Sequence, residues 1–303
     1  MQFLGTRTSK TGERLMSNVA ILDHSAHSRV ENDKARQLKT HYDPRYKLSW
    51  CLMKSEPRPC FTNQFLSEFH EYIRGVKEEM RISQGEKYDY IVLGSDTDGI
   101  FNLGGDLNLF RNYIETDNRD GLFNYAIRCV DILHENINHL DCDLTTIALV
   151  QGDAMGGGFE SALASNVVIA EKGVKMGLPE VLFNLFPGMG AYSLLSRRVG
   201  ASKAEQIILS GKLYTSEELF DMGVIDILAE KGEGEIEVYR YIKAANRYSN
   251  SYGAIRKVRD ICNQISYDEL IDIAKIWTDS AFKLTEKDLK VMGRLIKMQE
   301  QRV

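Results

Sequence analysis

The sequence lacks any apolar run close to the ~20 residues that a membrane-spanning helix requires. Residues 1–10 also lack the apolar core of a signal peptide, so we expect a cytoplasmic location. There is no excess of positive charge either, because the formal net charge is −5. These absences give no support to a nucleic-acid partner or a membrane partner.

Paired cysteines are also missing. The five cysteines include no C-x-x-C pair, their number is odd, and their spacing is wide. Reduced, mostly buried thiols are therefore expected instead of disulfides or a zinc site. We expect neither a metal ion nor an organic cofactor.

What the sequence does contain is a run of three glycines, Gly156 to Gly158, between an expected strand at residues 146–150 and an expected helix beginning near Glu160. Glycines let a backbone approach a ligand closely, and the start of a helix offers free N–H groups to an anion. Glu160 would lie beside these donors. The stretch predicts an anion-stabilising pocket with an acid or base in its wall.

Three well-known glycine motifs do not fit this stretch. A phosphate-binding loop needs Lys and Ser or Thr after its glycines, but Phe159 and Glu160 stand there. The dinucleotide fingerprint needs a third glycine where Ser161 stands, and no Gly-x-Ser-x-Gly nucleophile motif occurs. A hole of backbone amides with nearby glutamates remains.

A second glycine-rich loop, residues 94–106, follows an expected strand at residues 89–93. Asp106 or Asn102 can cap the helix expected from about Leu107. By itself this loop fits a structural turn about as well as a ligand loop. Its place at a strand end favours the ligand loop, because ligands collect at the carboxyl ends of strands in open α/β sheets.

Glu180 is the second candidate carboxylate. It follows Pro179, which ends the strand expected over residues 173–181, and it precedes the apolar residues 181–183. Apolar surroundings raise the pKa of a carboxyl group, so Glu180 is a candidate acid.

The chain divides into three parts by its pattern. Residues 1–45 are an N-terminal extension, residues 46–230 a β/α core, and residues 231–303 a helical region. Residues 231–235 are expected to form a flexible charged linker. The helices expected after it cover residues 236–263, 266–283 and 285–300.

Several motifs resemble the crotonase (enoyl-CoA hydratase/isomerase) superfamily, in order along residues 47–228. They are Gly-Asp-Ala-Met-Gly-Gly-Gly-Phe-Glu at residues 152–160, Gly-Leu-Pro-Glu-Val at 177–181 and Phe-Pro-Gly-Met-Gly at 186–190.

The sequence is more similar still to one branch of this superfamily, the diffusible-signal-factor synthases. These enzymes make cis-2-unsaturated fatty acid signals for bacterial quorum sensing. The similar segments are residues 92–98, 101–107, 176–193 and 276–279.

The resemblance implies an α/β fold, a crotonase-like ββα spiral core with a C-terminal helical region. That region would contribute to an acyl pocket and to trimerisation, so a homotrimer or a dimer of trimers is expected. In the signal-synthase branch the enzyme also binds the receiver domain of a sensor kinase, although this sequence shows no docking motif for one.

The resemblance also implies site residues. Gly105 and Gly157 occupy the positions of the two oxyanion-hole donors, and Glu160 and Glu180 occupy the two catalytic carboxylate positions. Trp277 either lines the acyl pocket or only packs its helix. The acyl-pocket residues implied as substrate contacts are Leu178, Phe183, Leu185, Met189, Tyr192 and Trp277.

Two carboxylates indicate hydration or dehydration rather than isomerisation alone. Removing the α-proton of a thioester requires stabilisation of charge on the carbonyl oxygen, and dehydration also needs a base and an acid. The hypothesis is dehydration of a 3-hydroxyacyl thioester of acyl carrier protein, followed by hydrolysis to a free cis-2-unsaturated fatty acid. The alternatives are an enoyl-CoA hydratase of β-oxidation, acting on a CoA thioester, and an interaction protein.

Overall fold

The computed structural model describes residues 36–54 and 56–300. Within them, a six-stranded sheet has the order β1-β2-β3-β5-β7-β10. The pair β1/β2 is antiparallel and the other neighbours are parallel. The strands are β1 (Leu38–Asp43), β2 (Leu48–Met53), β3 (Tyr90–Ser95), β5 (Thr145–Val150), β7 (Val167–Glu171) and β10 (Ile227–Ala229).

A second, four-stranded sheet has the order β4-β6-β8-β9. Its strands are β4 (Ile100–Asn102), β6 (Asp153–Met155), β8 (Lys175–Gly177) and β9 (Leu213–Thr215). Three times the chain passes from a strand of the large sheet into one of the small sheet and then into helical structure. The repeated ββα unit predicted from the sequence is therefore confirmed, and the three passes bring their loops to one end of the sheets.

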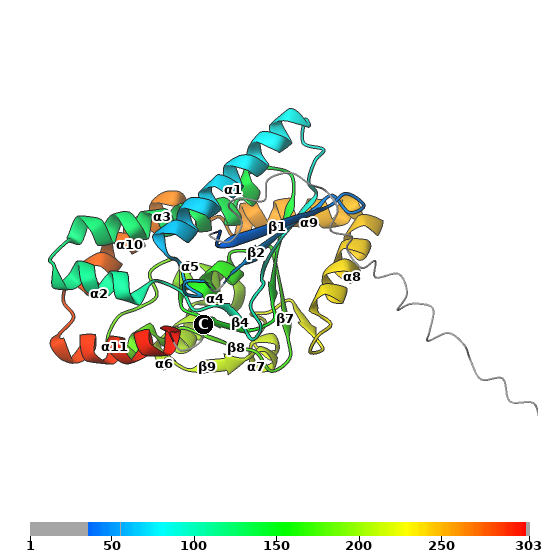
Figure 1. The fold of residues 1–303 in the computed structure, drawn as a ribbon. Helices are drawn as coiled ribbons and strands as arrows, with labels where there is room; N and C mark the ends of the chain where they lie inside the picture. Colours follow the sequence, from blue (N-terminus) through cyan, green and yellow to red (C-terminus); the bar gives the residue numbers. More distant parts are fainter. Residues whose placement is uncertain (1–35, 55, 301–303) are drawn as a thin grey trace, which may run out of the picture. The chain divides into compact units, whose positions relative to one another are not determined.

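The helices lie around these sheets (Figure 1). The cap expected at Asp106 forms, since its side chain accepts from the N–H group of Leu109, and Thr62 caps α1 in the same way by accepting from the N–H group of Phe65. The α-helices are α1 (Asn63–Ile82), α2 (Leu107–Glu115), α3 (Arg119–Ile137), α4 (Gly157–Leu163), α5 (Ala191–Val199), α6 (Ala201–Ser210), α7 (Ser216–Asp221), α8 (Gly234–Arg247), α9 (Ser249–Cys262), α10 (Tyr267–Ala281) and α11 (Glu286–Glu300).

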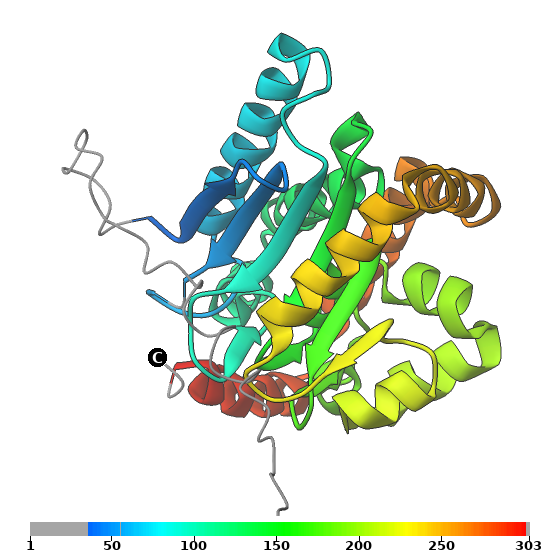
Figure 2. The same ribbon diagram turned by 90° about the vertical axis from the view of Figure 1, so that its right-hand side faces the viewer.

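The two faces of the large sheet are covered unequally. On one face, α8 lies across the strands (Figure 2) and buries Val238, Ile242 and Ala245 against them. The larger apolar core lies on the other face, where α1, α3 and α4 pack. Burial of apolar surface on both faces is what a mainly parallel sheet requires.

Two expectations for the chain after β7 need correction. The strand expected over residues 173–181 is only β8, because the chain turns at Leu178 into a short 3-10 helix, η3 (Pro179–Phe183). The linker at residues 231–235 is not free. Buried Glu171 accepts from the N–H groups of Gly232 at 2.8 Å and Gly234 at 3.0 Å, which fixes the start of α8.

The helix expected over residues 236–263 is broken at Tyr248, whose backbone leaves the helical region at φ −123° and ψ 40°. The break separates α8, which packs on the sheet, from α9, which buries no side chain.

The large sheet begins within the predicted N-terminal extension, because β1 starts at Leu38 and pairs with β2. Residues 1–35 of that extension lie outside the described residues. Among the residues that the structure does describe, no helix combines the length and apolar character needed to cross a bilayer.

Candidate active site

The two glycine loops predicted from the sequence lie against each other. They follow β4 and β6, which are neighbours in the small sheet. A Cβ atom on Gly104 would lie only 2.7 Å from the carbonyl oxygen of Met155 and 2.8 Å from the nitrogen of Gly157. Gly104 also has φ +86°, so glycine is required there for both reasons.

Gly105 and Gly157 both line the cavity at these loops, and their backbone N–H groups have no acceptor among the described residues. The carbonyl of Gly104 accepts from the N–H of Phe61 at 2.8 Å. In a trans peptide the C=O and N–H groups point in opposite directions, so the N–H of Gly105 points away from Phe61. Gly157 is the first residue of α4, so its N–H has no acceptor within that helix. Neither group donates to another described residue, and both glycines line one pocket.

Glu160 lies on the first turn of α4 and is 1% exposed. Its Oε1 accepts two backbone hydrogen bonds of 2.9 Å, from the N–H groups of Met189 and Ala191. Ala191 is the first residue of α5, so the carboxylate also lies at the positive end of that helix. These donors stabilise the ionised form of Glu160.

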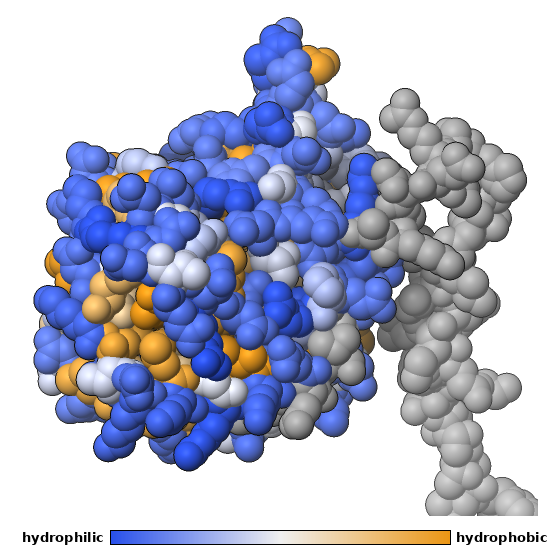
Figure 3. Space-filling view, turned by 60° about the vertical axis from the view of Figure 1, so that its left-hand side comes forward, coloured by the Kyte–Doolittle hydropathy of each residue, from blue (hydrophilic) through white to orange (hydrophobic). Residues whose placement is uncertain are grey.

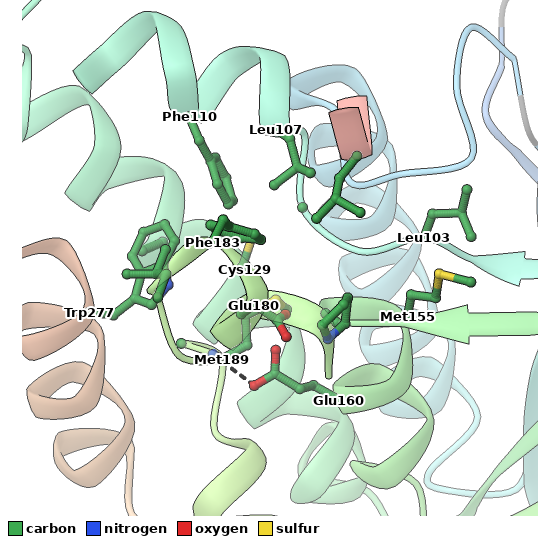
Figure 4. Close-up of a pocket in the computed structure, with 18 of the residues that line it drawn as sticks. Leu103, Leu107, Phe110, Cys129, Met155, Glu160, Glu180, Phe183, Met189 and Trp277 are labelled. Atoms are coloured by element: carbon green, nitrogen blue, oxygen red, sulfur yellow. Dashed lines mark hydrogen bonds between the residues drawn. The ribbon is translucent and has the colours of Figure 1, made fainter. Parts of the chain in front are cut away.

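Glu180 reaches the same cavity from η3, directly after Pro179. Its Oε1 lies against Gly156, where a Cβ atom would approach it to 2.5 Å. Its Oε2 is buried without a hydrogen-bond partner among the described residues. Figure 4 shows the carboxyl groups of Glu180 and Glu160 pointing toward one another.

The electrostatics of the two carboxyl groups differ. Burial raises the pKa of both, and the negative charge of Glu160 raises the pKa of Glu180 further. The N–H groups of Met189 and Ala191 act in the opposite direction on the pKa of Glu160. The arrangement therefore favours an ionised Glu160 facing a protonated Glu180, a base beside an acid.

The rest of the pocket is apolar. Trp277 of α10 packs against Gly188, where a Cβ atom would collide with its ring, and its ring centroid lies 5.1 Å from that of Phe110. Apolar surface ringed by hydrophilic residues also gathers on the side of the molecule that Figure 3 brings forward. The predicted acyl-pocket residues that do line the cavity are Phe183, Leu185, Met189 and Trp277.

Two predicted acyl-pocket residues do not line this cavity. Leu178 is fully buried just before η3, away from the lining, and Tyr192 is 44% exposed on α5, where its hydroxyl donates to Glu205. Residues on α2, α3 and α11 also line the cavity but were not predicted. In the sequence they belong to helical patterns that ordinary packing of a helix against the core explains. They include Leu107, Phe110, Tyr125, Cys129, Leu295 and Gln299.

In the described part of the chain, no three His, Cys, Asp or Glu side chains gather where they could hold a metal ion. The pocket combines two glycines with unpaired backbone N–H groups, two opposed carboxyl groups and apolar walls.

Comparison with known proteins shows which family the chain belongs to. A family model described as enoyl-CoA hydratase/isomerase matches residues 56–295. The chain belongs to the enoyl-CoA hydratase/isomerase family, within the crotonase superfamily. The matched range includes both glutamates and the helices from α8 to most of α11.

Relatives and solved structures agree with this membership. Human mitochondrial methylglutaconyl-CoA hydratase is 31% identical over 160 residues, which cover 52% of this chain and 45% of that relative's length. An enoyl-CoA hydratase from Bacillus halodurans has a TM-score of 0.72 at 22% identity, covering 86% of this chain and 100% of that one. Pseudomonas aeruginosa DspI has a TM-score of 0.63 at 20% identity, covering 80% and 93%. The predicted crotonase fold is confirmed.

Replacing Glu180 by Gln should stabilise the protein at neutral pH. The folded state raises the pKa of Glu180, so the folded protein holds the proton of this side chain more tightly than the unfolded chain does. The resulting contribution to the free energy of unfolding is complete below the unfolded pKa of about 4.3 and is lost as the pH rises toward the folded pKa. Urea unfolding should show Glu180→Gln more stable than wild type by on the order of 2 kcal/mol at about pH 8, and equal at about pH 4. The control makes the same replacement outside the pocket, Glu205→Gln at an exposed position of α6. Equal stability of Glu180→Gln and wild type at both pH values would contradict the buried, protonated carboxyl.

Proposed function

We propose that the protein dehydrates a 3-hydroxyacyl thioester of acyl carrier protein and then hydrolyses the product to a free cis-2-unsaturated fatty acid, a diffusible quorum-sensing signal. One observation carries the chemistry: two buried carboxyl groups face each other beside the N–H groups of Gly105 and Gly157. The segments similar to diffusible-signal-factor synthases support the choice of substrate and product.

In the first step the thioester oxygen accepts hydrogen bonds from Gly105 and Gly157, which acidifies the α-proton. Ionised Glu160 removes that proton, and the electron pair of the C–H bond forms the double bond. Glu180 gives its proton to the departing hydroxyl, which leaves as water. A proton then passes from Glu160 to Glu180, which restores the starting state.

The second step reuses the same donors. A water molecule, losing its proton to a glutamate carboxylate, attacks the thioester carbonyl, and the oxyanion forms where the thioester oxygen was held in the first step. When the carbonyl reforms, the C–S bond breaks, the thiolate takes that proton, and the fatty acid is released. The apolar channel past Phe183 and Trp277 suits the acyl chain.

An enoyl-CoA hydratase of β-oxidation is the alternative. The same base and acid would add water across a double bond in the reverse direction. Similarity to hydratases such as human methylglutaconyl-CoA hydratase supports a hydratase activity as well. Binding to a sensor kinase receiver domain stays a prediction.

Product analysis distinguishes the two functions. The purified protein is incubated with a 3-hydroxyacyl thioester of acyl carrier protein and, separately, with its CoA thioester. Mass spectrometry should show free cis-2-unsaturated acid, formed faster from the carrier-protein thioester. Reversible hydration with the thioester intact would contradict signal synthesis and favour the hydratase.

The same assay tests the two carboxyl groups. Glu160→Gln and Glu180→Gln should each lower the rate by about 10²–10⁴, because each removes one proton-transfer group. Glu205→Gln, on the surface, should keep the wild-type rate. Wild-type activity in either pocket variant would rule out the assigned roles.

We further propose that the chain self-associates through α9. This helix buries no side chain, and its apolar residues Ile255, Val258 and Ile261 are 65%, 51% and 80% exposed. Their spacing of three residues places them along one side of the helix, where a second copy would cover them.

Light scattering after size exclusion tests this proposal. Wild type should have three or six times the chain mass of 34.4 kDa, and the double variant Val258→Glu/Ile261→Glu should be smaller. Lys243→Glu, which places a carboxylate at an exposed position of α8, should leave the mass unchanged. A monomeric wild type, or a double variant of unchanged mass, would contradict association through α9.

A further inference from the structure

The loop that carries the Gly105 donor is held by hydrogen bonds from three separate segments. Phe61 donates to the carbonyl of Gly104 at 2.8 Å. The hydroxyl of Tyr125 accepts from the N–H of Asp106 at 3.2 Å and donates to the carbonyl of Phe61 at 2.6 Å. These contacts fix the peptide before Gly105 and the nitrogen of the residue after it.

The third segment is the last turn of α11, almost two hundred positions further along the chain. The side-chain amide of Gln299 donates to the carbonyl of Leu103 at 3.0 Å and to the carbonyl of Gly105 at 3.2 Å. Gln299 is 7% exposed and lines the pocket that holds the two glutamates. Both hydrogen bonds of the Gln299 amide therefore go to backbone carbonyls of the loop that contains Gly105.

We propose that Gln299 is a positioning residue for the oxyanion hole. The inference rests on the proposed roles of Gly105 and Gly157. Glycine turns easily about its backbone bonds, so the N–H of Gly105 keeps its direction only if both flanking peptides are held. Phe61 holds the preceding peptide, whereas the following one is held at its N–H by Tyr125 and at its carbonyl by Gln299.

Packing of α11 does not depend on Gln299. Met292 and Ile296 are 0% and 6% exposed, and they anchor the helix in the larger apolar core. At the start of the helix, Asn184 donates to Asp288 at 3.4 Å, which ties α11 to the turn after η3. Removing the amide of Gln299 should therefore leave α11 in place and remove only its two hydrogen bonds to the loop.

Gln299→Leu keeps the size of the side chain and removes both donors. We expect kcat for the thioester substrate to fall about 10- to 100-fold with KM little changed, because a small misplacement of a donor weakens transition-state binding. The matched control is Glu300→Ala. The exposed Glu300 side chain accepts from Asn108 of α2 and does not bond to the loop.

A spectroscopic readout separates positioning from packing. A conjugated dienoyl-CoA bound in an oxyanion hole absorbs at longer wavelength, because hydrogen bonds polarise its carbonyl. This red shift should be reduced in Gln299→Leu and unchanged in Glu300→Ala. In Gln299→Glu it should recover partly as the pH is lowered, because a protonated carboxyl supplies one O–H donor.

Two results would overturn the inference. One is a full red shift and wild-type kcat in Gln299→Leu. The other is a loss of kcat with an unchanged red shift, which would place the role of Gln299 outside the oxyanion hole. If wild type itself shows no red shift, the oxyanion hole is wrong and the positioning role falls with it. A normal red shift without product formation would contradict only the proposed reaction.

Discussion

Two carboxyl groups face one another in an apolar cavity, and the rest of the site depends on this contact. Two buried like charges repel strongly, so the pair holds one proton under ordinary conditions. The location of that proton follows from the neighbours. Glu160 has two N–H donors and the start of α5, whereas one carboxyl oxygen of Glu180 has no partner among the described residues. In the proposed mechanism, these two identical side chains therefore serve as a base and an acid.

The fold explains how these groups meet. Each ββα pass ends its small-sheet strand at the same end, so the loops after β4, β6 and β8 converge. The first loop brings Gly105, the second Gly157 and Glu160, and the third Glu180. Glycines at the contact let the loops touch, since a side chain on Gly104 or Gly156 would collide with the neighbouring loop. Helices α2, α3, α10 and α11 complete the apolar walls.

The sequence was most informative where the chemistry is local. Glycines between a strand and a helix, followed by Glu160, predicted an anion pocket with an acid or base in its wall, and Pro179 beside apolar residues pointed to Glu180. The resemblance supplied Gly105 and the crotonase fold, and the structure brings these residues together. Contacts between distant segments were not predictable. Nothing near Gln299 shows that α11 reaches the Gly105 loop, and nothing near Tyr192 shows that its side chain faces outward.

The proton shared by the two glutamates is the central claim, and infrared difference spectroscopy between the wild-type protein and Glu180→Gln measures it most directly. At neutral pH we predict that wild type has a C=O band of a protonated carboxyl group and that the variant lacks it. A difference spectrum containing only carboxylate bands would show that Glu180 is ionised in the free protein, and it would contradict the proposed division into acid and base.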